Sequence, residues 1–322
     1  MRAMSADNTM TIPSRFPPLL KIGAFPDAVD ARIRQTFDLI ELEALNNAPQ
    51  LRTRIEGIVT RSNYRISQEL LDQLPNLRII ATNGVGYDGI PVAYAERRGI
   101  VVTNTPEVLN KAVAELAVGL VLAILRHLPR ADQFVKSGAW QTASFPLGTS
   151  LAGKKIGMVG LGRIGKEIAK RLAPFDVEIA YFGRQPQPVD WAYFSDVQAL
   201  ASYADILIAC CPGGPDTHHI IDAAVLAALG PAGILVNIAR GSVVNEQDLC
   251  AALSGKLILG AALDVFNEEP LADSALRTLD NVILTPHIGS ATEETRLEMA
   301  ELAIKNLADY FQTGRAATPV TA

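Results

Sequence analysis

A glycine-rich turn set between an apolar strand and a helix restricts this chain to a small group of folds. The expected strand 155–160 leads into the run Gly160-Leu161-Gly162-Arg163-Ile164-Gly165, which has the pattern G-x-G-x-x-G, and a helical stretch opens directly after it. The first glycine permits a tight turn, the second lets the backbone approach a pyrophosphate, and the third lets the helix pack close to the strand. The free N–H groups at the helix start would face the phosphates. The segment therefore predicts a dinucleotide-binding site.

The end of the next strand indicates which dinucleotide is expected. An NAD site usually places Asp or Glu there, about 20 residues after the glycines, to bind the ribose hydroxyls. Here the expected strand 177–183 ends in Gly183, followed by Arg184 and Gln185. A guanidinium binds a 2′-phosphate bidentately, whereas a carboxylate would repel it. NADP(H) is therefore the expected cofactor, with NAD(H) possible; a solvated loop position is the alternative role of Arg184.

Short apolar strands and helical stretches alternate along the whole chain. A first series has expected strands at 19–24, 55–60, 77–83 and 100–103, with helices at 27–37, 67–74 and 91–98. A second series has strands at 155–160, 177–183, 206–210, 234–239, 258–265 and 282–285, with helices at 163–173, 222–229 and 246–253. Short apolar strands closed by Gly, Asn, Thr or Pro are typical of buried parallel sheets with helical crossovers.

A long helix is expected between the two series, at 108–127, and it is apolar nearly all round. Such a helix is buried between layers or at a subunit interface. We expect Pro129 to mark its end, His127 to act as a cation favoured by the helix dipole, and 131–150 to form a polar connector that contains Trp140. The chain closes with an amphipathic helix at 293–311, stopped by Gly314, and no strand is expected after it.

These elements predict an α/β fold of two doubly wound parallel sheets. Right-handed crossovers give each series its own sheet, and a length of 322 residues suits two domains. Because the last helix has no further strand to join, we expect it to return to the first sheet. The predicted architecture is a flavodoxin-like substrate-binding domain, 1–104 and 288–322, interrupted by a Rossmann dinucleotide-binding domain, 105–287.

Composition excludes several classes of protein. The net charge is −5 and no basic tract occurs, so a nucleic-acid partner is not expected. The most apolar stretch, 116–125, is about half a membrane span, and 5–9 is polar where a signal peptide needs its apolar run. Cys210, Cys211 and Cys250 fit no disulfide scaffold and no zinc spacing. We expect a cytoplasmic protein without membrane or metal, in which 1–18 form a loose tail.

Several separated segments resemble the D-isomer-specific 2-hydroxyacid dehydrogenases, and most of all the glyoxylate/hydroxypyruvate reductases. Besides the glycine turn, they are Asn83-Gly84-Val85-Gly86-Tyr87-Asp88, Val102-Thr103-Asn104-Thr105-Pro106, Ala112-Val113-Ala114-Glu115, Asn237-Ile238-Ala239-Arg240-Gly241, Ala262-Leu263-Asp264-Val265-Phe266-Asn267-Glu268-Glu269-Pro270 and Pro286-His287-Ile288-Gly289-Ser290-Ala291-Thr292. The resemblance runs from about residue 55 to the final helix. It implies reduction of a small 2-oxo acid to the D-2-hydroxy acid, with a homodimer as the expected assembly.

Three residues carry the expected catalytic chemistry. Arg240, Glu269 and His287 each follow a predicted strand of one sheet, and open α/β sheets bind ligands at that edge. A guanidinium suits the carboxylate and ketone of a 2-oxo acid, and an imidazole supplies a proton near neutral pH. A neighbouring carboxylate would favour the imidazolium. The resemblance assigns that carboxylate to Glu269, the acid before the proline, rather than to Glu268.

Further residues complete the predicted site. Gly84, Val85 and Gly86 would bind the substrate carboxylate through backbone N–H groups, opposite Arg240. By resemblance the turn after strand 206–210 covers the adenosine and Asp264 lies near the nicotinamide, although turn formation or helix capping suits Asp264 equally well. The remaining expected cofactor contacts are Cys211, Pro212, Thr217, Ile238, Ala239, Arg240, His287 and Gly289.

Two other functions remain open on the sequence. One is NAD-linked oxidation of the kind carried out by D-3-phosphoglycerate dehydrogenase, which Arg184 disfavours. The other is a non-catalytic, dinucleotide-sensing protein similar to the corepressors that share this fold, which predicts no turnover of any 2-oxo acid. Formate dehydrogenases share the scaffold but are expected to carry Gln in the position of Glu269.

Overall fold

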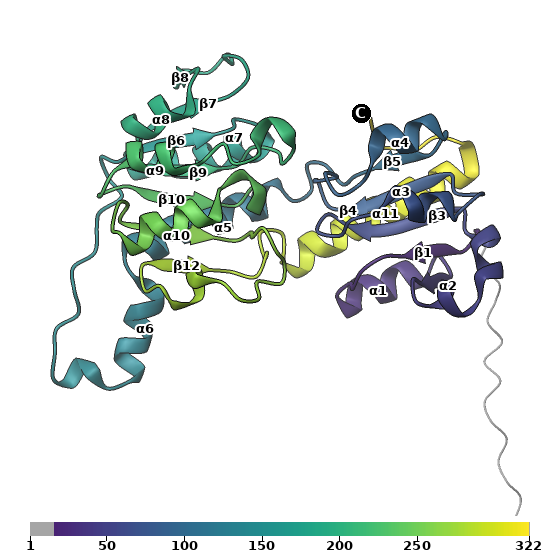
Figure 1. The fold of residues 1–322 in the computed structure, drawn as a ribbon, viewed down its shortest axis with the longest axis horizontal. Coiled ribbons are helices and arrows are strands. Elements are labelled where there is room, and N and C mark those ends of the chain that lie inside the picture. The colour runs from purple at the N-terminus through teal and green to yellow at the C-terminus, as the bar shows by residue number, and fades with distance from the viewer. Residues whose placement is uncertain (1–15, 322) are drawn as a thin grey trace, which may run out of the picture. The chain divides into compact units, whose positions relative to one another are not determined.

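The computed structural model describes residues 16–321, which divide into two compact units. Unit 1 takes the described residues of Met1–Pro106 and Leu297–Ala322, and unit 2 is Glu107–Arg296 (Figure 1). The sequence placed these divisions after residues 104 and 287. Residues 288–296 belong to unit 2, and the N–H groups of Ile288 and Gly289 bind the side chain of Asp264 in that unit. The expected tail, 1–18, lies almost entirely outside the described residues.

Unit 1 contains a parallel sheet with one short antiparallel edge strand. The strand order is β2-β1-β3-β4-β5, which is the flavodoxin-like order 2-1-3-4-5, with β13 added beside β5. The bounds are β1 Leu19–Lys21, β2 Leu39–Glu41, β3 Gly57–Arg61, β4 Ile79–Asn83, β5 Val101–Thr103 and β13 Pro319–Val320. The predicted fold class of this domain is confirmed.

Helices cover both faces of this sheet. On one face, α1 (Asp27–Arg34) and the part of α11 (Glu293–Thr313) in unit 1 share an apolar core with β1, β3 and β4. On the other face lie α2 (Ala44–Asn47), α3 (Gln68–Asp72) and α4 (Val92–Arg97). The last helix therefore returns to the first sheet, as expected, and the left-handed Gly314 ends it with φ +75°.

Unit 2 contains seven parallel strands in the order β8-β7-β6-β9-β10-β11-β12. The order reverses between β6 and β9, as in the Rossmann fold, so this fold class is also confirmed. The bounds are β6 Lys155–Val159, β7 Glu178–Phe182, β8 Ala192–Phe194, β9 Ile206–Ala209, β10 Ile234–Asn237, β11 Gly260–Leu263 and β12 Val282–Leu284. The four residues of β9, of β10 and of β11 are all buried, which explains why all of them are apolar except Asn237 at the end of β10.

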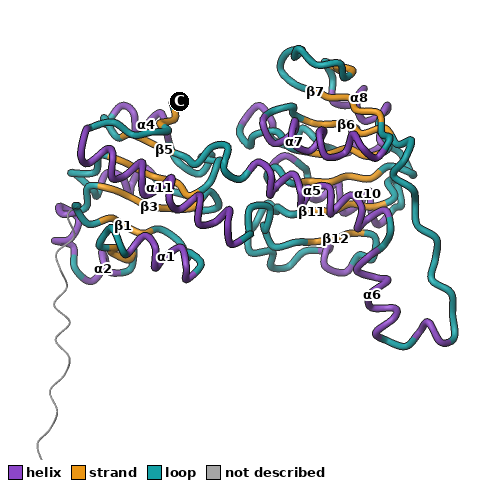
Figure 2. Tube along the Cα trace, turned by 180° about the vertical axis from the view of Figure 1, so that it is seen from behind, coloured by secondary structure: helices purple, strands orange, loops and turns teal. Residues whose placement is uncertain are grey.

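The helices of unit 2 also form two layers around the sheet (Figure 2). One layer is α8 (Val197–Tyr203), α9 (Ala223–Leu229) and α10 (Glu246–Ser254), which share a core with the strands. The other contains α5 (Asn110–Leu125) and α7 (Arg163–Leu172), which pack on each other. Among residues 16–321 no single helix is long and apolar enough to cross a membrane; α5 and α6 (Leu128–Lys136) pass such a test only as a pair bent by 59°.

Several short elements differ from the sequence expectation. The segment 131–150 is not all connector, because α6 occupies Leu128–Lys136 with Pro129 in its first turn, where proline is favoured. His127 is left-handed (φ 52°) and lies between the helices: its N–H donates to the Ile124 carbonyl of α5, and it precedes the first residue of α6. Its expected role as a cation at the end of α5 stays a prediction. The expectation of no strand after the last helix is also wrong, since β13 pairs with β5. Strands β2 and β8 and helices α2 and α8 were not predicted.

Candidate active site

Three loops at the carboxyl edge of unit 2 carry the predicted catalytic residues. Arg240 follows β10, Glu269 follows β11 and His287 follows β12. These strands are consecutive neighbours in the sheet and are paired in parallel, with Asn237 opposite Leu263 and Leu263 opposite Leu284. Because the strands are parallel and in register, the three loops begin side by side at the carboxyl edge of the sheet.

His287 and Glu269 form a hydrogen-bonded pair. The ring Nδ1 of His287 lies 2.6 Å from Oε2 of Glu269, whose Oε1 accepts the Phe266 N–H at 3.1 Å. Burial raises the pKa of Glu269, but the contacts with His287 and Phe266 and the charge of Arg240 outweigh it and hold that pKa below its usual value. The neighbouring Glu268 is exposed. The pair orients the imidazole through Nδ1 and leaves Nε2 for proton exchange.

Asp264 acts on the main chain beside His287. Its carboxylate accepts the Ile288 and Gly289 N–H groups, both at 2.8 Å, and the Thr285 hydroxyl at 2.6 Å. Burial of this side chain raises its pKa, against the effect of these hydrogen bonds. His287 itself adopts a left-handed φ of 52°, which is strained for a residue with a Cβ. Turn formation, one of the three roles open for Asp264 on the sequence, is thus present in the structure.

The loop of Arg240 packs directly on the loop of Glu269. A Cβ built on Gly241 would lie 1.9 Å from the carbonyl carbon of Phe266, so only glycine allows this approach. Arg240 is half-buried, and its Nη1 donates to the Ala239 carbonyl at 2.7 Å. Ile238 and Ala239, which precede it, are buried. Since the charge of Arg240 also lowers the pKa of Glu269, the structure brings Arg240, Glu269 and His287 together.

The glycine turn has the geometry that its sequence predicts. Gly160 has φ +99°, and a Cβ there would lie 2.8 Å from Cα of Cys211. A Cβ on Gly165 would meet the Gly160 carbonyl oxygen at 2.6 Å, so the third glycine allows close packing of α7 on the strand. A Cβ on Gly162 would have nothing within 4 Å, which leaves space in front of the first turn of α7. That turn holds no acidic residue, so it suits an anion.

The three side chains of the glycine turn differ in their exposure to solvent. Leu161 is buried and Ile164 is half-buried. Arg163 is exposed and pairs with Glu107 at 3.3 Å. The free space before α7 is therefore lined by backbone of the turn.

The loop after β7 holds Arg184 at the surface near this turn. The Gln187 N–H donates to the Tyr181 hydroxyl at 2.6 Å, and the Gln187 side chain donates to the Leu161 carbonyl at 2.8 Å. These bonds join the loop to the glycine turn. Arg184 and Gln185 are exposed between the anchors, next to a half-buried Gly183 whose carbonyl accepts the Tyr193 hydroxyl. The two donor sets, the α7 N–H groups and the Arg184 guanidinium, fit a dinucleotide with an added phosphate.

The turn after β9 is closed by its own polar groups. The Thr217 hydroxyl donates to the Pro212 carbonyl at 2.7 Å, and the Cys210 thiol donates to the Gly160 carbonyl at 2.9 Å. Burial raises the pKa of Cys211 to about 11 and also raises the pKa of Cys210. Both thiols stay protonated at neutral pH, so they pack as apolar groups and are poor nucleophiles.

Gly84, Val85 and Gly86 form the loop after β4 in unit 1. The Gly84 carbonyl accepts the Thr105 N–H at 2.9 Å, and the Val85 carbonyl accepts the Asn104 side chain at 2.8 Å. A Cβ on Gly84 would lie 2.6 Å from Oγ of Ser62. The carbonyls of this loop are thus bound by unit 1 itself, which fixes the course of its backbone.

Two residues of the site carried no predicted role. Gly241 lies in one of the segments that carry the family resemblance, but nothing along the chain shows that Phe266 approaches it. Thr285 ends the strand region before His287 and binds Asp264. Among residues 16–321 no group of three or more His, Cys, Asp or Glu side chains is arranged to hold a metal ion.

Comparisons with known proteins find relatives in sequence and in structure. Residues 118–289 match the family model described as D-isomer specific 2-hydroxyacid dehydrogenase, NAD binding domain. The hydroxyphenylpyruvate reductase of Plectranthus scutellarioides is 45% identical over 83% of this chain and 85% of that protein. The 2-ketogluconate reductase of Gluconobacter oxydans is 42% identical over 94% and 98%. The NADPH-dependent glyoxylate/hydroxypyruvate reductase of Sinorhizobium meliloti, solved with NADP and malonate, has a TM-score of 0.89 and 43% identity over 94% of this chain and 96% of that one.

The Gly241→Ala substitution tests the contact between the two loops. The new methyl group would overlap backbone atoms of Phe266 that no side-chain rotation can move, so we expect a loss of at least about 3 kcal/mol in stability and a clearly lower melting temperature. The control is Gly119→Ala in α5, where a Cβ meets nothing within 4 Å and the gain in helix propensity is at most about 1 kcal/mol. Equal melting temperatures by scanning calorimetry for the two variants would contradict the close approach.

Proposed function

Because the chain belongs to the D-isomer-specific 2-hydroxyacid dehydrogenases, we propose that it reduces a small 2-oxo acid of the glyoxylate or hydroxypyruvate type to the D-2-hydroxy acid, with NADPH. The observation that carries the proposal is the His287–Glu269 pair, 2.6 Å apart, beside Arg240. The relatives reduce hydroxyphenylpyruvate, 2-ketogluconate, or glyoxylate and hydroxypyruvate, as their names state. These substrates share a carboxylate next to a ketone or aldehyde.

His287 is the proposed proton donor. Reduction of the carbonyl develops negative charge on oxygen, and a proton delivered from Nε2 neutralises it. Glu269 holds Nδ1 and stabilises the imidazolium before transfer. Asp264 fixes the main chain after His287, so one carboxylate holds the ring and another holds the two residues that follow it.

Arg240 is the proposed anchor of the substrate. Its planar guanidinium presents paired N–H donors that match the carboxylate and carbonyl oxygens of a 2-oxo acid. We assign the backbone N–H groups of Gly84, Val85 and Gly86 to the same carboxylate. The support for this assignment is the fixed backbone of the loop, whose carbonyls are bound by Thr105 and Asn104.

The glycine turn and Arg184 are the proposed cofactor contacts. The nicotinamide supplies the hydride when NADPH is bound. Backbone N–H groups at the start of α7 would hold the pyrophosphate in the space before Gly162, and Arg184 would bind the 2′-phosphate. Gly183 and Gln185 flank Arg184 and would contact the same end of the cofactor. We assign Cys211, Pro212 and Thr217 to the adenosine, and Ile238, Ala239, Asp264 and Gly289 would hold the nicotinamide end.

The alternatives receive less support. An NAD-linked oxidation is disfavoured by the exposed Arg184 in the position where NAD sites carry an acid. A non-catalytic dinucleotide sensor needs no proton donor, and it gives no reason for the strained His287 to pair with Glu269 while Asp264 holds the two residues that follow it.

A homodimer formed by unit 2 and a cytoplasmic location complete the proposal. The segment 128–150, which we term the arm, projects from the sheet of unit 2 in both views (Figures 1 and 2). It exposes Leu128, Val135, Trp140 and Leu147, the last with 94% of its surface accessible. Several exposed large apolar side chains on one segment favour a protein interface. The three cysteine thiols suit a reducing compartment.

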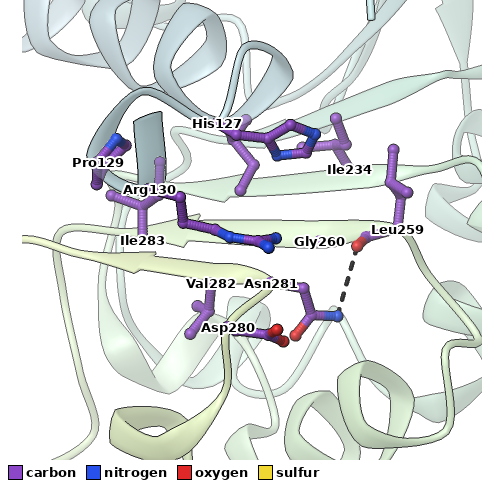
Figure 3. A pocket seen from close by; sticks show the side chains of 11 residues that line it. His127, Pro129, Arg130, Ile234, Leu259, Gly260, Asp280, Asn281, Val282 and Ile283 are labelled. Carbon is purple, nitrogen blue, oxygen red and sulfur yellow. Dashed lines mark hydrogen bonds between the residues drawn. The ribbon is translucent and has the colours of Figure 1, made fainter. Parts of the chain in front are cut away.

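An apolar hollow next to the arm extends this surface (Figure 3). It has about 460 Å³ of open volume and lies where β10, β11 and β12 begin, at the opposite edge of the sheet from His287. His127 and Arg130 face it from the arm side, and Asp280 and Asn281 from the sheet side. We assign arm and hollow to contact with a second copy of the chain.

The function is tested by following the absorbance of reduced nicotinamide with glyoxylate, hydroxypyruvate, pyruvate and an aryl pyruvate. We expect turnover with NADPH on at least one of them, and His287→Ala should lower kcat/KM by about 10²- to 10⁴-fold because the proton donor is lost. The control is His218→Ala, since His218 is exposed on the turn after β9. Turnover of His287→Ala at the wild-type rate would remove His287 from the mechanism, and no turnover of any acid would favour the sensor.

Cofactor preference is tested with Arg184→Asp. Replacing the guanidinium by a carboxylate removes a charge-assisted hydrogen bond to the 2′-phosphate and adds repulsion, so the ratio of kcat/KM for NADPH to that for NADH should fall by about 10-fold or more. Arg163→Asp is the control, because Arg163 already pairs with Glu107. A ratio unchanged by Arg184→Asp would refute the assignment of the phosphate.

The dimer is tested by sedimentation velocity. We expect the wild type to sediment as a dimer at micromolar concentration, and the double substitution Trp140→Asp with Leu147→Asp to sediment as a monomer, because charged groups would then be buried in the contact. Leu42→Asp, at an exposed leucine of unit 1, should leave the dimer intact. A monomeric wild type, or a dimeric double variant, would contradict the role of the arm.

A further inference from the structure

We propose that Asn237 is a positioning residue for Arg240: its side-chain amide binds the peptide group before Ala239 and the peptide group after Arg240, and so holds the segment that carries the guanidinium from both ends. The inference rests on the proposed function, in which Arg240 binds the 2-oxo acid. The Asn237 side chain would act in that reaction through the main chain of Ala239 and Arg240, to which it is hydrogen-bonded.

Asn237 is the last residue of β10 and its side chain is bound at both ends. Its Oδ1 accepts the Ala239 N–H at 3.0 Å, and its Nδ2 donates to the Arg240 carbonyl at 2.9 Å. The residue is 1% exposed, so water does not compete for these bonds. A neutral amide is the side chain that offers an acceptor and a donor in this spacing.

These two bonds determine the direction in which Arg240 leaves the backbone. The Ala239 N–H belongs to the peptide group before Ala239, and the Arg240 carbonyl belongs to the peptide group after Arg240. The group between them carries the Ala239 carbonyl, which accepts the guanidinium Nη1 at 2.7 Å. With both neighbouring groups held by one side chain, this carbonyl and the guanidinium bound to it have little freedom to turn.

The main chain of Asn237 extends the same support to the neighbouring loop. Its carbonyl accepts the Asp264 N–H at 2.9 Å, and the Arg240 carbonyl accepts a second donor, the Val243 N–H, at 3.2 Å. Asn237 therefore fixes the position of Arg240 relative to the loop that leads to Glu269. In a buried network of this kind a single lost partner has effects beyond one bond.

The Asn237→Asp substitution keeps the size of the side chain and the acceptor for Ala239, but replaces the donor to the Arg240 carbonyl by an oxygen. Repulsion between the two oxygens should turn the Arg240 peptide group. We expect kcat/KM for the best 2-oxo acid to fall by about 10- to 100-fold, as misplacement of a substrate-binding group does. Asn237→Ser, which is too short to reach both partners, should show a loss of similar size.

A double-mutant cycle separates positioning from a general loss of structure. In an Arg240→Ala background there is no guanidinium to misplace, so Asn237→Asp should change kcat/KM by less than about twofold. Asn245→Ala is the control: Asn245 caps α10 through Gln247 and Asp248, so its loss should lower the melting temperature while kcat/KM stays within about twofold of wild type.

The outcomes distinguish the inference from the function on which it rests. If Asn237→Asp costs the same factor in the wild type and in the Arg240→Ala background, or leaves kcat/KM of the wild type unchanged, Asn237 does not act through Arg240 and the inference is overturned. If Arg240→Ala itself retains wild-type activity, the proposed role of Arg240 fails first. A large loss that disappears in the Arg240→Ala background supports both.

Discussion

The parallel pairing of β10, β11 and β12 is the constraint on which the candidate site depends. Because the three strands run in one direction with Asn237, Leu263 and Leu284 in register, the loops that follow them begin at one edge and one level. A shift of register by one residue would turn every side chain of a strand to the opposite face. Since all four residues of β10 and of β11 are buried, on both faces of the sheet, such a shift would not expose their apolar side chains to solvent. Contacts between the loops are therefore also needed to hold the loops in place.

Backbone contacts between the loops supply that fixation. Gly241 touches the Phe266 carbonyl, and the Phe266 N–H binds Glu269, so one residue joins the loop of Arg240 to the partner of His287. The Asp264 N–H binds the Asn237 carbonyl, while its carboxylate binds the N–H groups after His287. The Arg240 guanidinium binds the Ala239 carbonyl, Glu269 binds the Phe266 N–H of its own loop, and the ring of His287 binds Glu269. Each functional side chain thus has a partner within these three loops, which limits its freedom to move.

The sequence predicted the parts of this arrangement that depend on local pattern. Alternation of apolar strands with helices predicted both sheets, and residues placed just after strands predicted Arg240, Glu269 and His287 as neighbours. The sequence missed β2, β8 and β13, which are short edge strands without a buried residue, and α6, which also buries no residue and so packs no apolar face on a core. The fit of Gly241 against Phe266 was beyond prediction, since it joins residues 25 positions apart through backbone packing.

The carboxylates of Asp264 and Glu269, both near His287, differ in their surroundings, and this difference gives them different roles. Asp264 is almost fully buried and bonds only to N–H and O–H donors in its loop region, so burial dominates and its pKa is raised. Glu269 is less buried and contacts the ring of His287 near Arg240, so positive charge dominates and its pKa is lowered. Glu269 therefore stays ionised where an imidazolium must be stabilised, while Asp264 maintains the turn. In a chain of net charge −5, the positive potential for an anionic substrate then depends on Arg240 and His287 themselves.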